Sequence, residues 1–457
     1  MTLKPPAIES DTIAAIATGR VLSAIGIVRI SGPETLAVLD RVFTPLSGRP
    51  MSLCPDRKLI LGRLTAVDGG VLDVCLATVS RGPNSYTGED TAELQCHGSP
   101  VVLRHALESL FAAGARQAKA GEFTRRAFLN GRMDLTQAEA VIDLIDAESA
   151  KAAENAAAQL DGAISRKTDG IYEELTAICS HYHAVLDYPD EDIEPFVLER
   201  YRKVMTAAAE KLSALLATFR RGDVLKNGVR CAILGRPNVG KSSLLNAFLG
   251  YDRAIVTNIP GTTRDTIEEK AVVGGVLLRL LDTAGLRETE DVVEQLGVER
   301  SRAAAESAEL VLAVLDGSRA LEAEDESVLA AAKAAPKAIV LRNKADLPAL
   351  WEREDALPVS ARTGEGMETL EQAVKALFPP EEAVAAGEVL TNPRQADAVR
   401  RALEYVRAAL EAMDAMITPD AVLTEVEGAL TALGELSGRI VREDITNGIF
   451  ARFCVGK

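Results

Sequence analysis

The sequence has no long apolar run and no mark of a secreted protein. No hydrophobic stretch approaches the roughly 20 residues that a helix needs to cross a bilayer. Residues 1–20 lack the basic start, apolar block and small-residue cleavage site of a signal peptide. The six cysteines form no C-x-x-C pair and lie mostly in strand-like or helical runs. We therefore expect a cytoplasmic protein with free, buried thiols and no membrane contact.

Positive charge is also scarce. The chain has 51 Lys and Arg against 67 Asp and Glu, a net charge of −16, whereas a protein that grips nucleic acid through its phosphates normally presents a basic face. Basic clusters occur at Arg125 and Arg126 and between residues 220 and 230, and most of them are interpreted as solvated helix ends. The 457 residues and 47% hydrophobic content are enough for about three domains with their own cores.

One stretch of the sequence points to a specific chemistry. Residues 235–242 read G-x-x-x-x-G-K-S, between the apolar run 229–234 and a helical pattern at 243–249. A loop between a buried strand and a helix holds phosphates on backbone N–H groups at the helix N-terminus, and its lysine, here Lys241, reaches the β and γ oxygens. Ser242 would place its hydroxyl on Mg²⁺. An accidental Gly-rich turn is the alternative, and the motifs downstream argue against it.

Two of those motifs predict guanine as the base. Asn343-Lys344-Ala345-Asp346 follows the apolar run 338–341, and the carboxylate of Asp346 can accept hydrogen bonds from N1–H and the N2 amine of guanine. Adenine offers neither donor, and a site built for a polar partner rejects a base that leaves it unpaired. The stretch Val359-Ser360-Ala361-Arg362 would supply the backbone N–H that contacts guanine O6.

Two segments between these motifs would sense the third phosphate. Asp282-Thr283-Ala284-Gly285 ends the apolar run 276–281, so Asp282 can hold the Mg²⁺ shell and Gly285 can bond the γ-phosphate through its N–H. Thr263, at the end of segment 257–263, is the candidate residue that closes onto Mg²⁺. Without the phosphate loop upstream, Thr262 and Thr263 would be interpreted as an ordinary polar loop.

The sequence lacks two parts that Ras-like GTPases use for hydrolysis. Leu286 stands where a glutamine usually orients the attacking water, and no arginine finger can be picked out from spacing. A carboxylate of the acidic stretch 288–294 could orient the water, although a solvated face is an equal alternative for each of them. A monovalent cation could supply the missing positive charge, and Asn238 offers one oxygen beside the phosphates.

The chain resembles, from its first to its last residues, the bacterial MnmE (TrmE) family of tRNA-modifying GTPases. The family's phosphate loop reads G-R-P-N-x-G-K-S-S, its first switch is close to residues 257–265 of this sequence, and its ending matches Phe453-Cys454-Val455-Gly456-Lys457. The resemblance implies a K⁺-activated GTPase that forms a homodimer and alters C5 of the wobble uridine of certain tRNAs. The one-carbon unit would come from a tetrahydrofolate derivative, either 5-formyl- or methylene-tetrahydrofolate.

The same resemblance implies a flavoprotein partner, MnmG (GidA), in a hetero-oligomer. Because this chain has no marked basic face, we expect the partner to carry much of the tRNA contact. A ribosome-assembly GTPase that acts as a nucleotide-gated RNA-binding module is the alternative. Such proteins usually append a basic RNA-binding domain or a second G domain, and this sequence contains neither.

The resemblance also implies roles for single residues. K⁺ would bind Asn238 and oxygens of Thr257, Ile259 and Thr262, in place of an arginine finger, and Glu294 would orient the water. Folate would contact Arg29, Glu93, Arg132 (where the family often has Lys) and Lys457, while Cys454 would take part in modification. Lys241, Arg287 and Glu294 are the expected catalytic residues, and Ser242 and Thr263 the expected Mg²⁺ ligands. The expected GTP contacts are Asn238, Val239, Gly240, Lys241, Ser242, Ser243, Thr257, Asn258, Ile259, Pro260, Gly261, Thr262, Thr263, Asp282, Thr283, Ala284, Gly285, Asn343, Lys344, Ala345, Asp346, Ser360, Ala361 and Arg362.

The pattern along the chain predicts a multidomain protein of mixed α/β and α+β class. Residues 1–118 alternate strand-like runs at 25–30, 58–64, 72–79 and 92–96 with helical runs at 33–43 and 100–113. This alternation is typical of an α+β unit, and the resemblance makes it a dimerisation and folate-binding domain. A helical composition covers 119–226, a Ras-like P-loop G domain covers 227–380, and helices resume over 381–457. The economical interpretation is one all-α domain interrupted by an inserted G domain.

Overall fold

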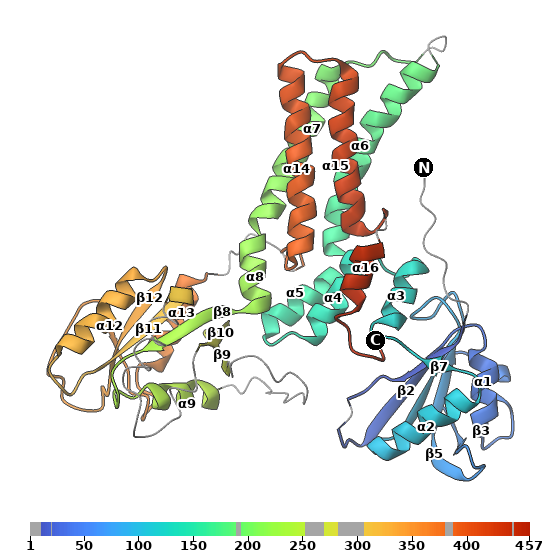
Figure 1. The fold of residues 1–457 in the computed structure, drawn as a ribbon, viewed down its shortest axis with the longest axis horizontal. Helices are drawn as coiled ribbons and strands as arrows, with labels where there is room; N and C mark the ends of the chain where they lie inside the picture. Colours follow the sequence, from blue (N-terminus) through green and yellow to red (C-terminus); the bar gives the residue numbers. More distant parts are fainter. Residues whose placement is uncertain are drawn as a thin grey trace. The chain divides into compact units, whose positions relative to one another are not determined.

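The computed structural model describes residues 11–19, 21–188, 193–251, 269–281, 306–379, 387–440 and 443–457. The chain separates into two compact units, each built from segments that are distant in sequence (Figure 1). Unit 1 contains Met1–Ile142, Leu160–Glu210 and Ala398–Lys457, and unit 2 contains Asp143–Gln159 and Lys211–Asp397. The domain boundaries expected after residues 118, 226 and 380 stay predictions.

Unit 1 holds a seven-stranded sheet in the order β3-β4-β5-β6-β2-β1-β7. Its pairs are antiparallel except for β1 with β7, which is parallel. The strands are β1 Ile13–Ile16, β2 Ile25–Ser31, β3 Phe43–Pro45, β4 Ile60–Thr65, β5 Val71–Ser80, β6 Thr91–His97 and β7 Arg116–Gln117.

Two helices, α1 Thr35–Val42 and α2 Pro100–Ala112, cover this sheet. In α1 the buried residues are Thr35, Val38, Leu39 and Val42, the spacing that gives a helix one apolar face. They share a core with alternate residues of the central strands, such as Val28 and Ile30. An antiparallel sheet with helices on one face is the α+β arrangement.

Most of the other helices precede or follow, along the chain, the strands of unit 2. Among them, α6 and α15 lie side by side in unit 1 (Figure 1), with Ile164, Ile171, Leu175 and Ile178 of α6 buried. No helix of the described ranges combines the length and apolar character needed to span a membrane. Their bounds are α3 Glu122–Leu129, α4 Leu135–Ile145, α5 Ala150–Leu160, α6 Ala163–Asp187, α7 Leu198–Ala217, α8 Phe219–Asn227, α14 Pro393–Asp414, α15 Pro419–Ser437 and α16 Glu443–Phe450, with a short 3₁₀ turn η1 at Met51–Leu53.

Unit 2 holds a six-stranded sheet in the order β13-β12-β11-β8-β10-β9. The pairs are parallel except for β9 with β10. From β8 the chain passes to β9 and β10 on one side and then to β11, β12 and β13 on the other. Ligands of open α/β sheets bind at such a reversal, outside the carboxyl ends of the strands. The elements are β8 Val229–Leu234, α9 Lys241–Tyr251, β9 Glu269–Val273, β10 Val276–Leu280, β11 Leu310–Asp316, α12 Ala323–Ala334, β12 Ala338–Asn343, β13 Ala356–Pro358 and α13 Met367–Leu377.

Candidate functional site

The phosphate loop lies at that reversal point, between the end of β8 at Leu234 and the start of α9 at Lys241. Asn238 is exposed and has a φ of +63°, and Gly240 has a φ of +99°. A Cβ at Gly240 would lie 2.2 Å from Nδ2 of Asn343, so a side chain at this position would collide with the guanine motif. The second glycine of the phosphate loop is therefore required by both its backbone conformation and its neighbour.

Asn343 connects the phosphate loop, residues 235–242, to the guanine loop, the stretch 359–362 that is expected to contact guanine. Its Nδ2 donates to the carbonyl oxygen of Val239 at 2.7 Å. Its Oδ1 accepts from the N–H of Ala361 at 3.1 Å. The residue is only 3% exposed, so both bonds are shielded from water and fix the distance between the two loops.

Lys241 is the first residue of α9 and points back over the loop. Its Nζ donates to the carbonyl oxygens of Gly235 at 2.6 Å and Arg236 at 2.8 Å. Burial lowers the pKa of the ammonium group from its usual value. Ser242 and Ser243 follow in the first turn of the helix, where backbone N–H groups favour an anion.

The residue expected to select guanine is held in an ionised form. Asp346 accepts a hydrogen bond from the hydroxyl of Ser360 at 2.7 Å, and this bond keeps the pKa of Asp346 below its usual value. Ser360 is fully buried, and its oxygen also accepts from the N–H of Thr363 at 3.2 Å. A carboxylate that stays charged and oriented can accept two bonds from the guanine edge.

Lys344 and Asp316 form an ion pair beside the guanine motif. Nζ of Lys344 lies 2.6 Å from Oδ2 of Asp316, at the end of β11. Burial opposes ionisation of this carboxyl, but hydrogen bonds from Lys344 and Ser318 hold the pKa of Asp316 below its usual value. Ala345 completes the motif by donating its N–H to the carbonyl of Val359 at 3.0 Å.

Sequence reasoning did not single out Arg236 within the phosphate loop. Its guanidinium pairs with Glu322 at 2.9 Å, Glu324 at 3.0 Å and Asp325 at 3.2 Å. Glu322 and Asp325 are also the two members of the capping box that begins α12. The acidic run at the start of a helix was the available signal, and it indicates a cationic neighbour that complements it.

Most of the expected switch residues lie outside the described residues. Of the expected K⁺ ligands only Asn238 is described, and of the expected Mg²⁺ ligands only Ser242. The expected contacts outside the described residues are Thr257, Asn258, Ile259, Pro260, Gly261, Thr262, Thr263, Asp282, Thr283, Ala284, Gly285, Arg287 and Glu294.

In unit 1, two of the residues expected to contact folate form an ion pair. Arg29 on β2 and Glu93 on β6 are directly opposite in the strand register. Nε and Nη2 of Arg29 each lie 2.9 Å from Oε1 of Glu93, and the two side chains are 20% and 28% exposed. The guanidinium lies over the rings of Tyr86, at 5.4 Å, and Phe123, at 5.8 Å. The pair is thus half-buried against aromatic side chains.

The C-terminal residues fold back onto the sheet domain close to this pair. The carbonyl of Lys457 accepts from the N–H of Phe123 at 3.2 Å, and Val455 forms a bridge with Ala120. Phe453 is 4% exposed, and its ring lies 5.7 Å from that of Phe450. Phe123 therefore contacts both Arg29 and the backbone of the last residue.

The side chain of Cys454 is exposed, although the residue is held by its backbone. Its carbonyl accepts from the N–H of Gly121 at 3.4 Å. Arg132 is also exposed, and its N–H donates to the carbonyl of Ala127 at 2.8 Å, just after α3. The structure thus brings Arg29 and the backbone of Lys457 into contact with Phe123, near the start of α3, and Arg132 lies just beyond the other end of that helix.

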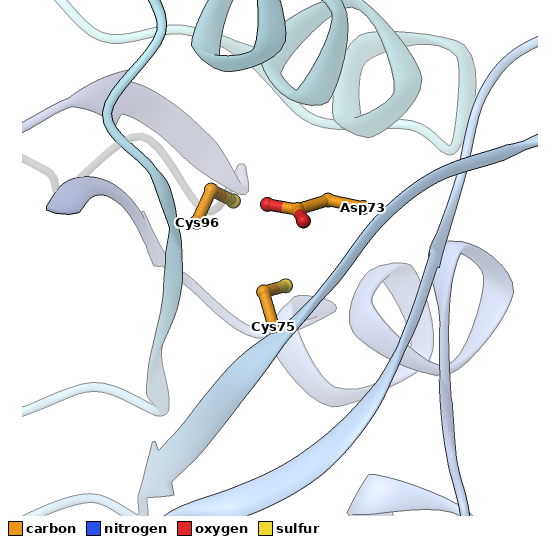
Figure 2. Close-up of side chains that lie close together, drawn as sticks. All are labelled: Asp73, Cys75 and Cys96. Atoms are coloured by element: carbon orange, nitrogen blue, oxygen red, sulfur yellow. The ribbon is translucent and has the colours of Figure 1, made fainter. Parts of the chain in front are cut away.

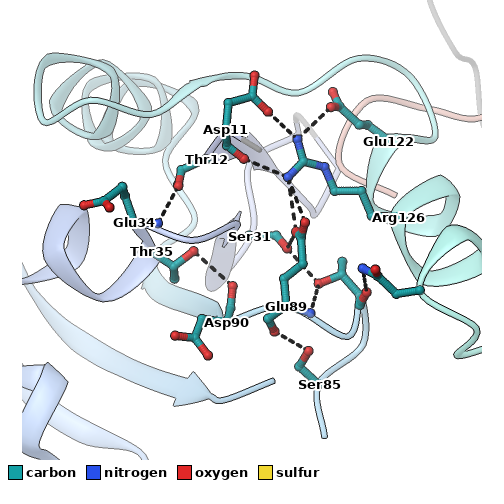
Figure 3. Close-up of polar contacts among 12 residues, drawn as sticks. Asp11, Thr12, Ser31, Glu34, Thr35, Ser85, Glu89, Asp90, Glu122 and Arg126 are labelled. Atoms are coloured by element: carbon teal, nitrogen blue, oxygen red, sulfur yellow. Dashed lines mark hydrogen bonds and ion pairs between the residues drawn. The ribbon is translucent and has the colours of Figure 1, made fainter. Parts of the chain in front are cut away.

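Arg126 corrects one expectation from the sequence. It belongs to one of the basic clusters, most of which are expected to be solvated helix ends, but its side chain is 4% exposed and enclosed by three carboxylates (Figure 3). Its Nη2 donates to Asp11 at 2.7 Å and Glu122 at 3.1 Å, and its Nη1 to Glu89 at 3.1 Å. No local signal marks this role, because Asp11 and Glu89 come from segments distant from Arg126 in the sequence.

The parallel sheet, the phosphate loop at its reversal point and an oriented carboxylate for the base define a P-loop GTPase. Known proteins agree. A family model described as MnmE helical domain matches residues 135–454, and one described as GTP-binding protein TrmE N-terminus matches residues 12–132. The chain belongs to the MnmE family of tRNA modification GTPases. This membership also confirms the predicted combination of an N-terminal α+β domain, a helical domain and a GTPase domain.

Full-length relatives support the same assignment. The tRNA modification GTPase MnmE of Roseiflexus sp. (strain RS-1) is 44% identical over 464 residues, covering 98% of this chain and 99% of that protein. The tRNA modification GTPase MnmE of Symbiobacterium thermophilum is 43% identical over 456 residues, with the same coverage. A crystal structure of Aquifex aeolicus Era bound to GDP and aluminium fluoride covers 40% of this chain and 66% of that chain at 26% identity and a TM-score of 0.26. A TM-score this low gives no support for a shared overall fold.

Proposed function

We propose that this chain is a K⁺-activated GTPase that acts in the cytoplasm with a flavoprotein of the MnmG (GidA) type. Together they would modify C5 of the wobble uridine of certain tRNAs with a folate-borne one-carbon unit. Family membership carries the coarser statement, a tRNA-modifying GTPase. The observation that supports the finer proposal is the C-terminal tail docked on Phe123: the carbonyl of Lys457 accepts from the Phe123 N–H, and the Phe123 ring also contacts Arg29 of the expected folate site.

The phosphate loop and the guanine loop divide the work of holding GTP. Lys241 now donates to the carbonyls of Gly235 and Arg236. With GTP bound, its ammonium group would turn to the β and γ phosphate oxygens, which are charged and therefore stronger acceptors. Asp346 would accept from guanine while Ser360 holds its orientation. Asn343 keeps both loops at a fixed spacing.

Two cations fit the residues present. Ser242 and Thr263 offer hydroxyl oxygens, the hard donors that Mg²⁺ prefers, and the ion would neutralise charge that develops on the phosphates. Asn238 lies exposed in the loop, and its amide oxygen, with oxygens of Thr257, Ile259 and Thr262, would hold K⁺. That ion would supply the positive charge that an arginine finger supplies elsewhere. Glu294 would orient the attacking water, and Arg287 would stabilise the segment that carries it.

The Arg29–Glu93 pair suits the folate ring system. Both contacts from the Arg29 guanidinium go to Oε1 of Glu93, and Oε2 can accept from an N–H of a pterin ring. The aromatic faces of Tyr86 and Phe123 beside the pair would line an apolar side of the site. Arg132 and Lys457 would pair with the ligand's carboxylates. Two copies of the chain, joined through this domain, would make the homodimer, and tRNA would be held mainly by the flavoprotein.

Nucleoside analysis of tRNA tests the modification. Cells that lack the protein are expected to lose the modified wobble uridine, and the wild-type chain is expected to restore it. Cys454→Ser should fail to restore it while keeping normal GTP hydrolysis, because the Cys454 side chain is exposed and makes no packing contribution. Unchanged wobble uridines in the deletion would instead support a ribosome-assembly GTPase.

Turnover measured in K⁺ and in Na⁺ tests the hydrolysis proposal. The wild-type chain is expected to hydrolyse GTP roughly 10²-fold faster in K⁺, the usual effect of one charge placed against a transition state. Asn238→Ala should lose this difference while its rate in Na⁺ stays near that of the wild type. Equal wild-type rates in the two salts would reject K⁺ activation and leave the tRNA result unaffected.

A further inference from the structure

A cluster of two thiols and a carboxylate lies in the sheet of unit 1 and contains none of the residues expected to bind nucleotide or folate (Figure 2). Asp73 and Cys75 are two residues apart on β5, so their side chains share one face of the strand. The register Leu76↔Gln95 sets Cys75 beside Cys96 on β6. The Oδ atom of Asp73 and the two Sγ atoms all lie within 4.8 Å of one another.

The three side chains differ in their exposure. Cys75 and Cys96 are 4% and 1% exposed and belong to the main core of the sheet. The carboxylate of Asp73 is 8% exposed and is held from outside by His97. Oδ2 accepts from the N–H of His97 at 2.9 Å, and Oδ1 lies 2.8 Å from its Nδ1. The imidazole itself is 74% exposed, so the cluster has a dry interior and a polar rim.

We propose that Asp73, Cys75 and Cys96 bind a thiophilic divalent cation, with Zn²⁺ as the best match. Two thiolates and a carboxylate are a donor set that Zn²⁺ takes, and a water would complete the tetrahedron. Zn–S bonds of about 2.3 Å and Zn–O bonds of about 2.1 Å in a tetrahedron imply donor separations of about 3.5–3.8 Å. The observed limit of 4.8 Å exceeds this by about 1 Å, which small χ1 rotations of the three side chains can close.

His97 would act on the ion through Asp73. In zinc sites a hydrogen-bonded partner outside the ligands fixes the orientation of a ligand, and its loss typically weakens metal binding about 10–100-fold. The two bonds from His97 to Asp73 have this arrangement. The exposed imidazole also marks the side from which an ion can enter, since the other side is filled by the core.

An oxidised Cys75–Cys96 pair is the competing chemistry, and the surroundings disfavour it. Disulfide formation starts from a thiolate that an oxidant can reach. Cys75 and Cys96 are 4% and 1% exposed within the core of the sheet, so an oxidant in solution does not reach their sulfurs. A cation brings its own positive charge and displaces the thiol protons as it binds.

Titration of the full-length chain with Co²⁺, followed by competition with Zn²⁺, tests the proposal. Thiolate ligation gives a sulfur-to-cobalt charge-transfer absorption, which the oxygen donors of the Mg²⁺ site cannot give. The wild type is expected to develop this absorption at one Co²⁺ per chain and to lose it when Zn²⁺ is added. Cys75→Ser and Cys96→Ser should abolish it, and His97→Ala should weaken binding about 10–100-fold.

Two further variants keep the result interpretable. Cys54→Ser is the matched control, because Cys54 is a buried cysteine of the same core whose Sγ contacts only nearby carbonyls in the described part of the chain; it should keep the absorption. Asp73→Asn leaves both thiols and the core untouched, and it should bind at least as weakly as His97→Ala. A wild type without the absorption overturns the site. So does an absorption that persists in Cys75→Ser or Cys96→Ser, or one that forms with wild-type affinity in a folded Asp73→Asn.

Discussion

Single residues decide the chemistry of this protein where backbone shape and burial leave one choice. Gly240 must have a positive φ and no side chain, and Asn343 fills the space that a Cβ would need. This part of the site could be predicted from the sequence, because strand, loop and helix are consecutive and the motif spacing is local. The bonds from Asn343 to Val239 and Ala361 could not, since they join segments about 100 and 18 residues apart.

Arg126 shows the reverse case, a residue whose role is invisible in a local pattern. Burial opposes the charged form of Glu122, but hydrogen bonds from Arg116, the Lys119 N–H and Arg126 hold the pKa of Glu122 below its usual value. The pKa of Asp11 is also lowered, by hydrogen bonds from Arg116 and Arg126 against the effect of burial. Arg125, its neighbour, has the same side-chain type, so composition alone cannot separate the two.

Replacement of Arg126 tests this network. Arg126→Met is expected to destabilise the chain by about 3–5 kcal/mol, because three carboxylates lose a buried partner. Denaturant unfolding followed by circular dichroism measures the change. Arg104→Met is the control: Arg104 is exposed, and its ion pair with Glu108 spans 3.9 Å, so a change of less than about 1 kcal/mol is expected.

The same network predicts an acid response. The folded pKa values of Asp11 and Glu122 lie below their ordinary values of 3.8 and 4.5. Their stabilisation is therefore complete above about pH 4.5 and is lost as pH falls through the folded values. The melting temperature of the wild type should drop over this range, and that of Arg126→Met should drop less, because its carboxylates titrate nearer their ordinary values. Parallel curves for the two proteins would contradict this.

At the scale of elements, the sequence predicted the strands and helices with a clear apolar period and missed the short ones. Strand-like runs at residues 25–30, 72–79 and 92–96 correspond to β2, β5 and β6. β1 was missed because its residues Ile13–Ile16 are short and buried without alternation, and β7 is only two residues long. The docking of the C-terminal tail could not be predicted from pattern, because it depends on a contact with Phe123 more than 300 residues away.

Gly456 holds that tail in place and offers a sharp test. Its φ is +106°, and a Cβ there would lie 2.2 Å from the carbonyl oxygen of Ile16. Gly456→Ala is expected to lift the tail from Phe123 and reduce tRNA modification at unchanged GTP turnover. Amide hydrogen exchange at Phe123 should rise by about 10-fold or more as its acceptor is lost.

Gly448→Ala is the matched control for that variant. Gly448 lies in α16, and a Cβ there would meet nothing within 4 Å. This change should leave modification intact and add up to about 1 kcal/mol of stability, because alanine favours a helix over glycine. If Gly456→Ala keeps full modification with the tail displaced, the tail has no part in the chemistry.

At the scale of the molecule, the segments that lead into and out of the sheet of unit 2 are held by one carboxylate. Asp143, at the end of α4, pairs with Lys226 of α8 at 2.6 Å, just before β8 begins. It also accepts from the hydroxyl of Thr391 at 2.8 Å, where the chain returns. Asn155 of α5 accepts from the N–H of Gly387 at 2.9 Å on the same return path. The inserted G domain stays a prediction, whereas the shared anchor of the two segments is visible only in the folded chain.

Removal of this anchor should loosen both ends together. Asp143→Ala is expected to cost about 3–5 kcal/mol, because the carboxylate is 6% exposed and Lys226 and Thr391 lose their partner. Limited proteolysis should then cleave the chain faster near residues 226 and 391. Calorimetry should show a lower unfolding temperature. Asp161→Ala removes an exposed ion pair with Arg166. It should leave the cleavage rates unchanged and alter the free energy of unfolding by less than about 1 kcal/mol. Faster cleavage at one end alone would show that the ends are fixed separately.

The amide of Asn343 has a final consequence for small molecules. One side chain supports both the loop expected to bind the nucleobase and the loop expected to bind the triphosphate. A compound that displaces the base-binding loop is therefore expected to loosen the phosphate-binding loop without contacting it. Such an allosteric compound would speed release of the nucleotide at its phosphate end. Its potency would depend on the Asn343 side chain more than on contacts with the base.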